Sequence, residues 1–205
     1  SDLSPAASKT SGRVTRLELA ACVALGVIGV YSTSFGPAMS ILARDFGVSL
    51  DRVGLLLTVL FLGSIVASAG VAVRLHRFDP RLFTGAGLLL VAAGTAGIAL
   101  APDWQAALAS VAVTGLGGGL MDAGAHTIVA RVSLDVARGI HRLNVCFAAG
   151  AVAGPLLSGG VLAIDGGGRP LVYLVIAALA ASSAALMLTA GPIEPGALRD
   201  ARRDP

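Results

Sequence analysis

Apolar residues along the chain are gathered into six long runs that are separated by short polar connections. The runs cover residues 17–43, 53–73, 82–101, 104–132, 143–164 and 170–190. Each run has about 20 residues or more, which is enough for a helix to cross a bilayer core roughly 30 Å thick. The pattern therefore predicts an all-α membrane protein with six transmembrane helices in the bundle 17–190. Residues 1–16, rich in Ser, Ala and basic residues, are expected to be disordered, and residues 191–205 are expected to form a polar tail.

Composition supports a membrane protein and excludes several other classes. The chain has 205 residues, of which 55% are hydrophobic and only 13% are charged, whereas soluble domains are typically about 25% charged. Basic residues lie in short clusters between apolar runs instead of on one face, so we expect no nucleic-acid partner. Cys22 and Cys146 both fall in apolar runs and are interpreted as small buried residues in preference to a disulfide or a metal site. No metal-ligand spacing, phosphate-binding loop or nucleophile beside a base is found, so neither an enzyme nor a bound cofactor is expected.

Basic residues are distributed unevenly between the two sides of the predicted bundle. If residue 1 lies in the cytoplasm, only Arg44, Arg52 and Arg169 of the 15 Lys and Arg residues fall on the opposite side. Such a bias follows the positive-inside rule. We therefore expect a multi-pass protein of the plasma (inner) membrane with both termini in the cytoplasm.

The fourth apolar run carries an ionisable pair. It holds no charge from Trp104 to Met121, and then presents Asp122 and, four residues later, His126. This spacing puts both side chains on one face of a helix. Ionisable groups at membrane depth cost several kcal/mol unless they face a partner or water, so they mark a functional site by default. The aspartic acid could load and release a proton as its access to water changes, with the imidazole as modulator; the alternative is a hydrogen-bonded pair that only fixes helix packing.

The first run has a polar centre and a helix breaker. Tyr31, Ser32 and Ser34 offer hydroxyls that could bind a polar solute, whereas Gly36 and Pro37 should kink or break the helix. Nearby Ser and Thr hydroxyls are expected to satisfy the backbone carbonyls that the proline frees.

Two more stretches carry recognisable spacing. The loop from Ala72 to Arg81 is basic, with Arg77 and Arg81. The fifth run contains Asn144 followed by Gly150, Gly154 and Pro155. The glycines are typical of close helix packing, and Asn144 is either a polar liner of a cavity mouth or a cap at the helix end.

Together these features resemble the N-terminal half of a major facilitator superfamily transporter over about residues 17–190. The loop is similar to the superfamily motif Gly-x-Leu-x-Asp-Arg-x-Gly-x-Arg, with Arg77 and Arg81 matching and with Ala72, His76 and Asp79 as departures. The Gly-rich fourth run and the fifth run resemble the branch of the fucose permease and the sodium-dependent glucose transporter-like proteins. The resemblance implies half of the superfamily fold, a 3+3 inverted repeat. It also implies a role for Asp122 in proton coupling and sugar recognition, with His126 replacing the branch's Asn.

The resemblance sets the expected function and partners. We expect a half-size secondary carrier of a small polar solute such as a sugar, driven by a proton or sodium gradient without other cofactors. Superfamily transporters rock two six-helix halves about a central site, so the lipid-embedded chain is expected to form a homodimer or to pair with a separate second half. A drug/proton antiporter half is an alternative, because Gly154 to Gly159 partly matches the antiporter motif Gly-Pro-x-x-Gly-Gly. A non-transporting fragment or receptor-like protein is a third possibility.

Overall fold

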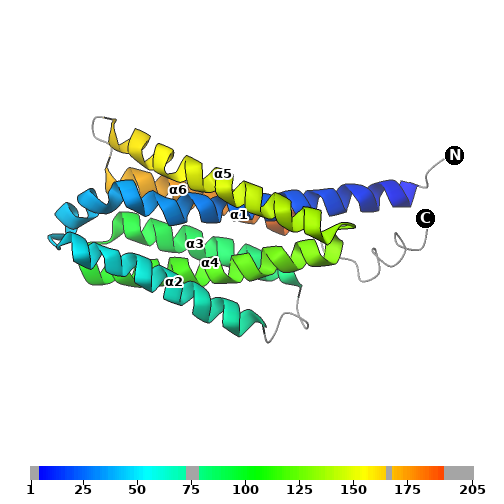
Figure 1. The fold of residues 1–205 in the computed structure, drawn as a ribbon, viewed down its shortest axis with the longest axis horizontal. Coiled ribbons are helices and arrows are strands. Elements are labelled where there is room, and N and C mark those ends of the chain that lie inside the picture. Colours follow the sequence, from blue (N-terminus) through cyan, green and yellow to red (C-terminus); the bar gives the residue numbers. More distant parts are fainter. Residues whose placement is uncertain (1–4, 73–78, 165–167, 192–205) are drawn as a thin grey trace.

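Six helices account for nearly all of the chain that the computed structural model describes, namely residues 5–72, 79–164 and 168–191. In order they are α1 (Pro5–Phe46), α2 (Leu50–Ala72), α3 (Pro80–Leu100), α4 (Trp104–Val132), α5 (Val136–Leu162) and α6 (Arg169–Thr189). All six are long and apolar enough to cross a membrane. The prediction of an all-α, six-helix membrane protein is confirmed. Helices α1, α3 and α5 begin, and α2, α4 and α6 end, at one end of the bundle (Figure 1), here called the basic end because Arg81, Arg131, Arg138 and Arg142 lie there.

Two helix starts differ from the sequence-based expectation, and one expected break is not found. Residues 5–16, expected to be disordered, belong to α1, which begins at Pro5; a proline is well accommodated in the first turn of a helix. Pro37 lies inside α1 without ending it. Helix α5 begins well before the predicted residue 143, because the Asp135 carboxylate caps it by accepting a hydrogen bond from the Arg138 N–H at 3.0 Å.

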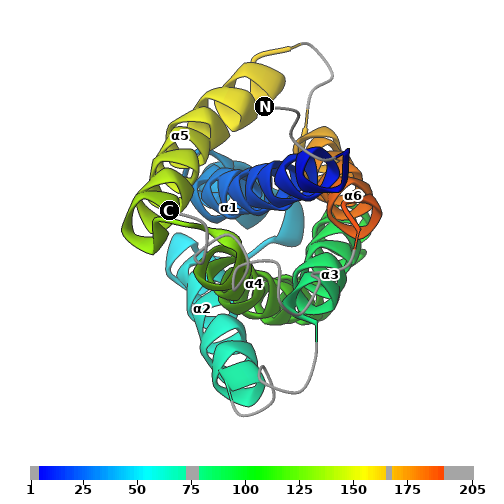
Figure 2. The same ribbon diagram turned by 90° about the vertical axis from the view of Figure 1, so that its right-hand side faces the viewer.

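The helices are arranged around α1 and α4. Seen from the basic end, α2 and α5 flank these two on one side and α3 and α6 lie on the other (Figure 2). Only 22% of the residues in the α2 span and 17% of those in the α5 span are buried, against 44–50% in the other four helices. The α2–α5 side of the bundle therefore offers much of its surface to whatever surrounds the chain.

Helices α1–α3 and helices α4–α6 make equivalent contacts, and the two triplets begin at opposite ends of the bundle (Figure 1). α1 packs along α5, and α4 packs along α2, so exchanging α1–α3 with α4–α6 maps the first contact onto the second. The α3–α6 contact maps onto itself. It is closed at both ends by an arginine: Arg81 at the start of α3 donates to the Leu188 carbonyl at the end of α6 (3.4 Å), and Arg169 at the start of α6 donates to the Ile98 and Ala101 carbonyls at the end of α3 (3.1 Å each). This is the expected 3+3 inverted repeat.

Small residues let the paired helices approach to backbone contact. A Cβ added to Gly150 of α5 would lie 3.0 Å from the Gly26 Cα of α1. One added to Gly115 of α4 would lie 3.1 Å from the Leu60 Cα of α2. In lipid, where apolar side chains gain nothing by leaving the solvent, such close contact is a main source of helix association.

Gly150 and Gly160 of α5 provide a matched test of this contact. We expect Gly150→Ala to lower the free energy of unfolding by about 1–3 kcal/mol, because the new methyl group overlaps the α1 backbone. Gly160→Ala has no atom within 4 Å of the new Cβ and should leave stability unchanged or raise it by up to about 1 kcal/mol through helix propensity. The measurement is the monodisperse fraction left after heating in detergent. Equal melting of the two variants would contradict the proposed backbone contact.

Candidate functional site

The ionisable pair of α4 is a bonded unit. His126 Nδ1 lies 2.9 Å from the backbone oxygen of Asp122 and 3.3 Å from its carboxylate Oδ1. A carbonyl oxygen only accepts hydrogen bonds, so this contact requires the proton of the imidazole on Nδ1. Nε2 is then the ring atom that can gain or lose a proton.

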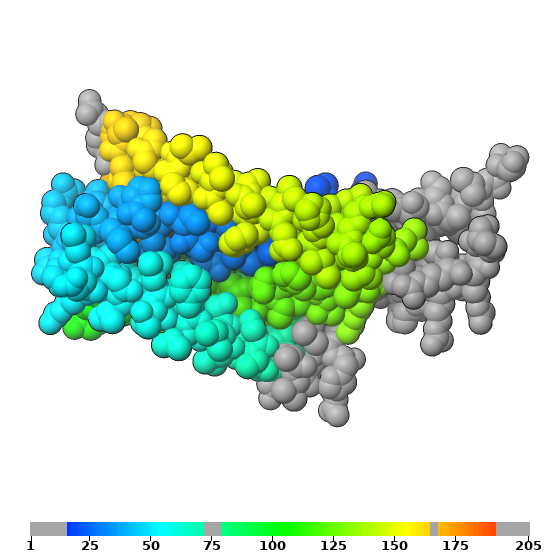
Figure 3. All heavy atoms as spheres, viewed as in Figure 1, coloured from blue at the N-terminus to red at the C-terminus, as the bar shows by residue number. Residues whose placement is uncertain are grey.

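The pair lies on a part of the α4 surface that the bundle leaves open. The side chains of Asp122 and His126 are 48% and 38% exposed. Around the axis of α4, both side chains point between the directions of Gly118 and Gly119. Gly118 meets Tyr31 of α1, and Gly119 meets Ser64 of α2. In the space-filling view α4 (green) is visible between α2 (cyan) and α5 (yellow to lime), next to α1 (blue) (Figure 3). The pair is therefore not sealed in a dry contact between two helices of this chain.

Tyr31 of α1 packs against α4 beneath the surface that carries Asp122 and His126. It is buried, and its hydroxyl lies where a Cβ on Gly118 would be. Gly118 precedes Asp122 by one helical turn on the same face of α4. Tyr31 thus connects α1 to the turn that carries the pair, and its ring is closed off from solvent.

The serines expected to contact a solute are differently placed. Ser34 is fully buried, and its hydroxyl donates to the Val30 carbonyl at 2.6 Å and to the Gly154 carbonyl of α5 at 3.4 Å. The expectation that Ser34 contacts a solute is corrected: its side chain is sealed between α1 and α5. Ser32 is half-buried and donates to the Ile28 carbonyl at 2.7 Å. Both hydroxyls thus bond to carbonyls one turn earlier and not to the Thr33 carbonyl, which Pro37 deprives of its donor.

The remaining predicted residues are divided between packing and open surface. Gly150 and Gly154 lie where α5 touches α1, and Pro155 follows inside α5 without ending it. Gly36 and Pro37, expected to kink or break the first helix, lie inside α1 without ending it; both are exposed, and a Cβ added to Gly36 has no atom within 4 Å. Asn144 is exposed on α5.

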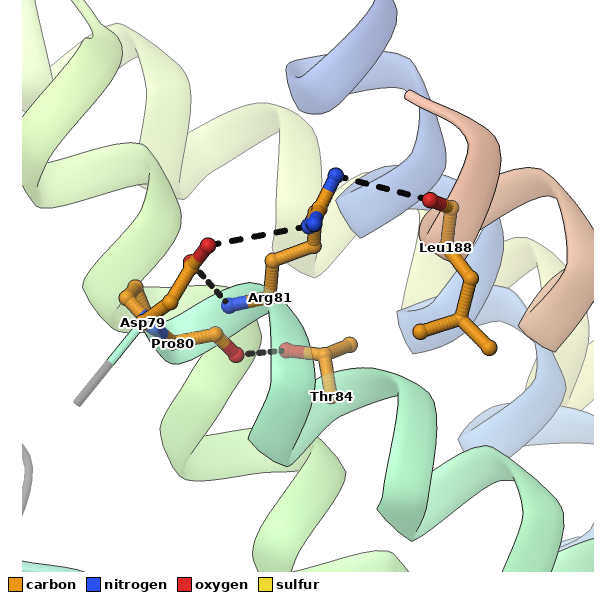
Figure 4. Close-up of polar contacts among 5 residues, drawn as sticks. All are labelled: Asp79, Pro80, Arg81, Thr84 and Leu188. Atoms are coloured by element: carbon orange, nitrogen blue, oxygen red, sulfur yellow. Dashed lines mark hydrogen bonds and ion pairs between the residues drawn. The ribbon is translucent and has the colours of Figure 1, made fainter. Parts of the chain in front are cut away.

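The loop motif is described only at its end. Arg77 lies outside the described residues. Arg81 is held within the chain: its backbone N–H donates to Asp79 Oδ1 at 3.0 Å, its Nε lies 3.7 Å from Asp79 Oδ2, and its Nη1 reaches the Leu188 carbonyl (Figure 4). Asp79, which replaces a glycine of the superfamily motif, therefore caps α3 and orients Arg81 toward α6.

The structure also contains one polar junction that no sequence pattern indicated. Glu18, near the basic end of α1, accepts a hydrogen bond from the Ser133 hydroxyl at the end of α4, and its Oε2 lies 3.7 Å from Nη1 of Arg142 on α5. A lone glutamate just inside an apolar run was the available signal. Its partners could not be inferred, because they come from two other helices.

Comparison with protein-family models relates the chain to a known family. The family model of the Major Facilitator Superfamily matches residues 20–204. No curated protein matches the chain.

Gly118 and Tyr31 allow the support beneath the pair to be tested. We expect Gly118→Ala to lower the free energy of unfolding by about 1–2 kcal/mol, because its methyl group meets the Tyr31 hydroxyl. Tyr31→Phe removes the closest atom and should recover most of this loss in the Gly118→Ala background. The two substitutions and their combination form a double-mutant cycle, read by thermal unfolding in detergent. Additive effects would show that the two side chains do not meet.

Proposed function

The chain belongs to the Major Facilitator Superfamily, whose members are transporters, and we propose that it works as one six-helix half of a proton-coupled carrier for a small polar solute. The observation that carries this proposal is the half-exposed Asp122–His126 pair, one turn beyond Gly118, the middle residue of α4. Ionisable groups at this depth are costly where lipid or a dry contact covers them. Their retention on an open face is explained if water or a second bundle meets them there.

Coupling would follow from a change in what covers this face. When the face opens to water, Asp122 is stabilised as a carboxylate and releases its proton. When the second half closes over it, the neutral carboxylic acid is favoured and a proton is taken up. His126 would modulate this exchange through the hydrogen bond from Nδ1, while Nε2 would take up a proton from water and release it to water or to the solute. Rocking of the two halves against each other would alternate the two conditions.

The solute contacts would come from the same side of the bundle. Ser32 and Asn144 have polar groups on or near open surface, whereas Ser34 and Tyr31 are occupied in packing. Hydroxyl and amide groups suit a sugar or a related compound. By the positive-inside rule, we place the basic end in the cytoplasm and the chain in the plasma membrane.

We expect Asp122→Asn to abolish uptake against a gradient while exchange down a gradient continues, because the amide can bind hydrogen-bonding groups but cannot carry a proton. The assay uses the full chain in proteoliposomes with an alkaline interior and a panel of radiolabelled monosaccharides, with the monosaccharide that the unaltered chain takes up serving as probe. Gradient-driven uptake by Asp122→Asn would exclude Asp122 as the coupling group. His126→Asn is the matched control and should keep uptake with a shifted pH optimum. Flux only outward would instead favour an efflux carrier, and no flux under any gradient a non-transporting protein.

The second half is proposed to be another copy of this chain, related by a two-fold axis parallel to the membrane normal. The sparsely buried α2 and α5 supply the open faces that such a pair would bring together. Native mass spectrometry in mild detergent should therefore show a dimer. A strict monomer under conditions that preserve transport would contradict the dimer, and a complex with a different protein would identify a separate second half.

A further inference from the structure

Helices α1 and α5 run side by side in the same direction and meet in evenly spaced pairs. Near the basic end, Glu18 pairs with Arg142. Farther along, a Cβ on Gly150 would lie 2.8 Å from the Gly26 carbonyl carbon, and a Cβ on Gly154 would lie 3.1 Å from the Val30 Cα. From Gly26–Gly150 to the next pair both helices advance by four residues, which is about one turn. The two helices therefore stay in register over these turns.

Cys22 and Cys146 occupy the turn between the first two pairs. Each lies four residues after Glu18 or Arg142 and four residues before Gly26 or Gly150. The register places them opposite each other, with their side chains close enough to interact. The Cys146 carbonyl lies 3.6 Å from the position of a Cβ on Gly26. The sequence alone suggested two unrelated buried residues, but the structure shows that they face each other.

The surroundings suit a bond between the two sulfurs. A disulfide requires Cα atoms about 4.4–6.8 Å apart, and the glycines one turn away allow the helix backbones to come this close. Both cysteines are free and partly exposed. They also lie one turn from the Glu18–Arg142 pair, whose arginine side chain is 60% exposed, so a water-soluble reagent can approach from the basic end.

We propose that Cys22 and Cys146 form an oxidisable dithiol, which closes to a disulfide between α1 and α5 on reaction with a low-molecular-weight disulfide. One cysteine thiolate attacks the small disulfide, releasing one small thiol and leaving a mixed disulfide. The second thiolate attacks the protein sulfur of that bond and releases the second small thiol. The two cysteines lose two electrons and two protons, and the two small thiols gain them.

The bond would add a covalent tie within the contact that attaches α5 to the rest of the bundle. α5 is the least buried of the six spans and is attached mainly through its stripe against α1. A disulfide in that stripe would keep α5 in register with α1. It would also close a long loop of the chain, which restricts the unfolded state. This inference does not depend on the proposed transport function.

The test uses the full chain in detergent, treated with oxidised glutathione, denatured, and alkylated with N-ethylmaleimide. The unaltered chain should lose the mass of two hydrogen atoms, take up no maleimide, and regain two reactive thiols after treatment with dithiothreitol. It should also melt at a higher temperature when oxidised. Glutathione adducts on the unaltered chain, or two thiols that remain free, would overturn the proposal.

Two kinds of control test whether the disulfide forms because the cysteines face each other or only because the chain has two reactive thiols. Cys22→Ser and Cys146→Ser should each leave a single thiol that is free or bound to glutathione. In a chain with Cys146→Ser and Ala148→Cys, the second thiol moves to an exposed position of α5, and the number of cysteines is unchanged. This chain should form no internal disulfide. If it loses two hydrogen atoms as readily as the unaltered chain, facing position is not the cause and the proposal fails.

Discussion

Close contact between helix backbones is the constraint on which this fold depends. A bilayer removes the hydrophobic force that holds soluble bundles together, so helices must gain their contact energy from packing itself. In this chain glycines make such close contacts: Gly26 meets Gly150 between α1 and α5, and Gly115 meets Leu60 between α2 and α4. The two contacts are related by the inverted repeat. They attach the two least buried helices, α2 and α5, to the central pair α1 and α4.

The third contact of the repeat, between α3 and α6, is closed at its two ends by charged side chains. The last carbonyls of a helix have no partner within the helix and carry partial negative charge. Arg81 and Arg169 each satisfy such carbonyls on the other helix, and each also lies beside a carboxylate, at 3.7 Å from Asp79 and 3.5 Å from Asp45. The guanidinium of Arg169 also stacks over the ring of Phe46 at 4.3 Å. The α3–α6 side of the bundle is thus closed at both ends.

This division leaves the α2–α5 side as the open face that the proposed function uses. Polar groups that could have served a site are used in packing where helices meet, as with Ser34 and the ring of Tyr31. Asp122 and His126 bond to each other and remain half-exposed on the open side. In the proposed transport role, the surroundings of the α2–α5 side change as the carrier works. The contacts of the α3–α6 side, which the two arginines close, stay the same.

The sequence by itself determined the six helices and the pairing of Asp122 with His126. Both follow from local rules: the length of an apolar run sets a span, and four residues along a helix set a neighbour. Only the tertiary structure decided that Gly36 packs against nothing, that Ser34 is sealed by Gly154, and that Cys22 faces Cys146. These outcomes depend on which helices lie side by side and in what register. The physical reason is that such contacts join residues more than a hundred positions apart, as from Ser34 to Gly154. The pattern of apolar residues within one helix does not indicate which other helix packs against it.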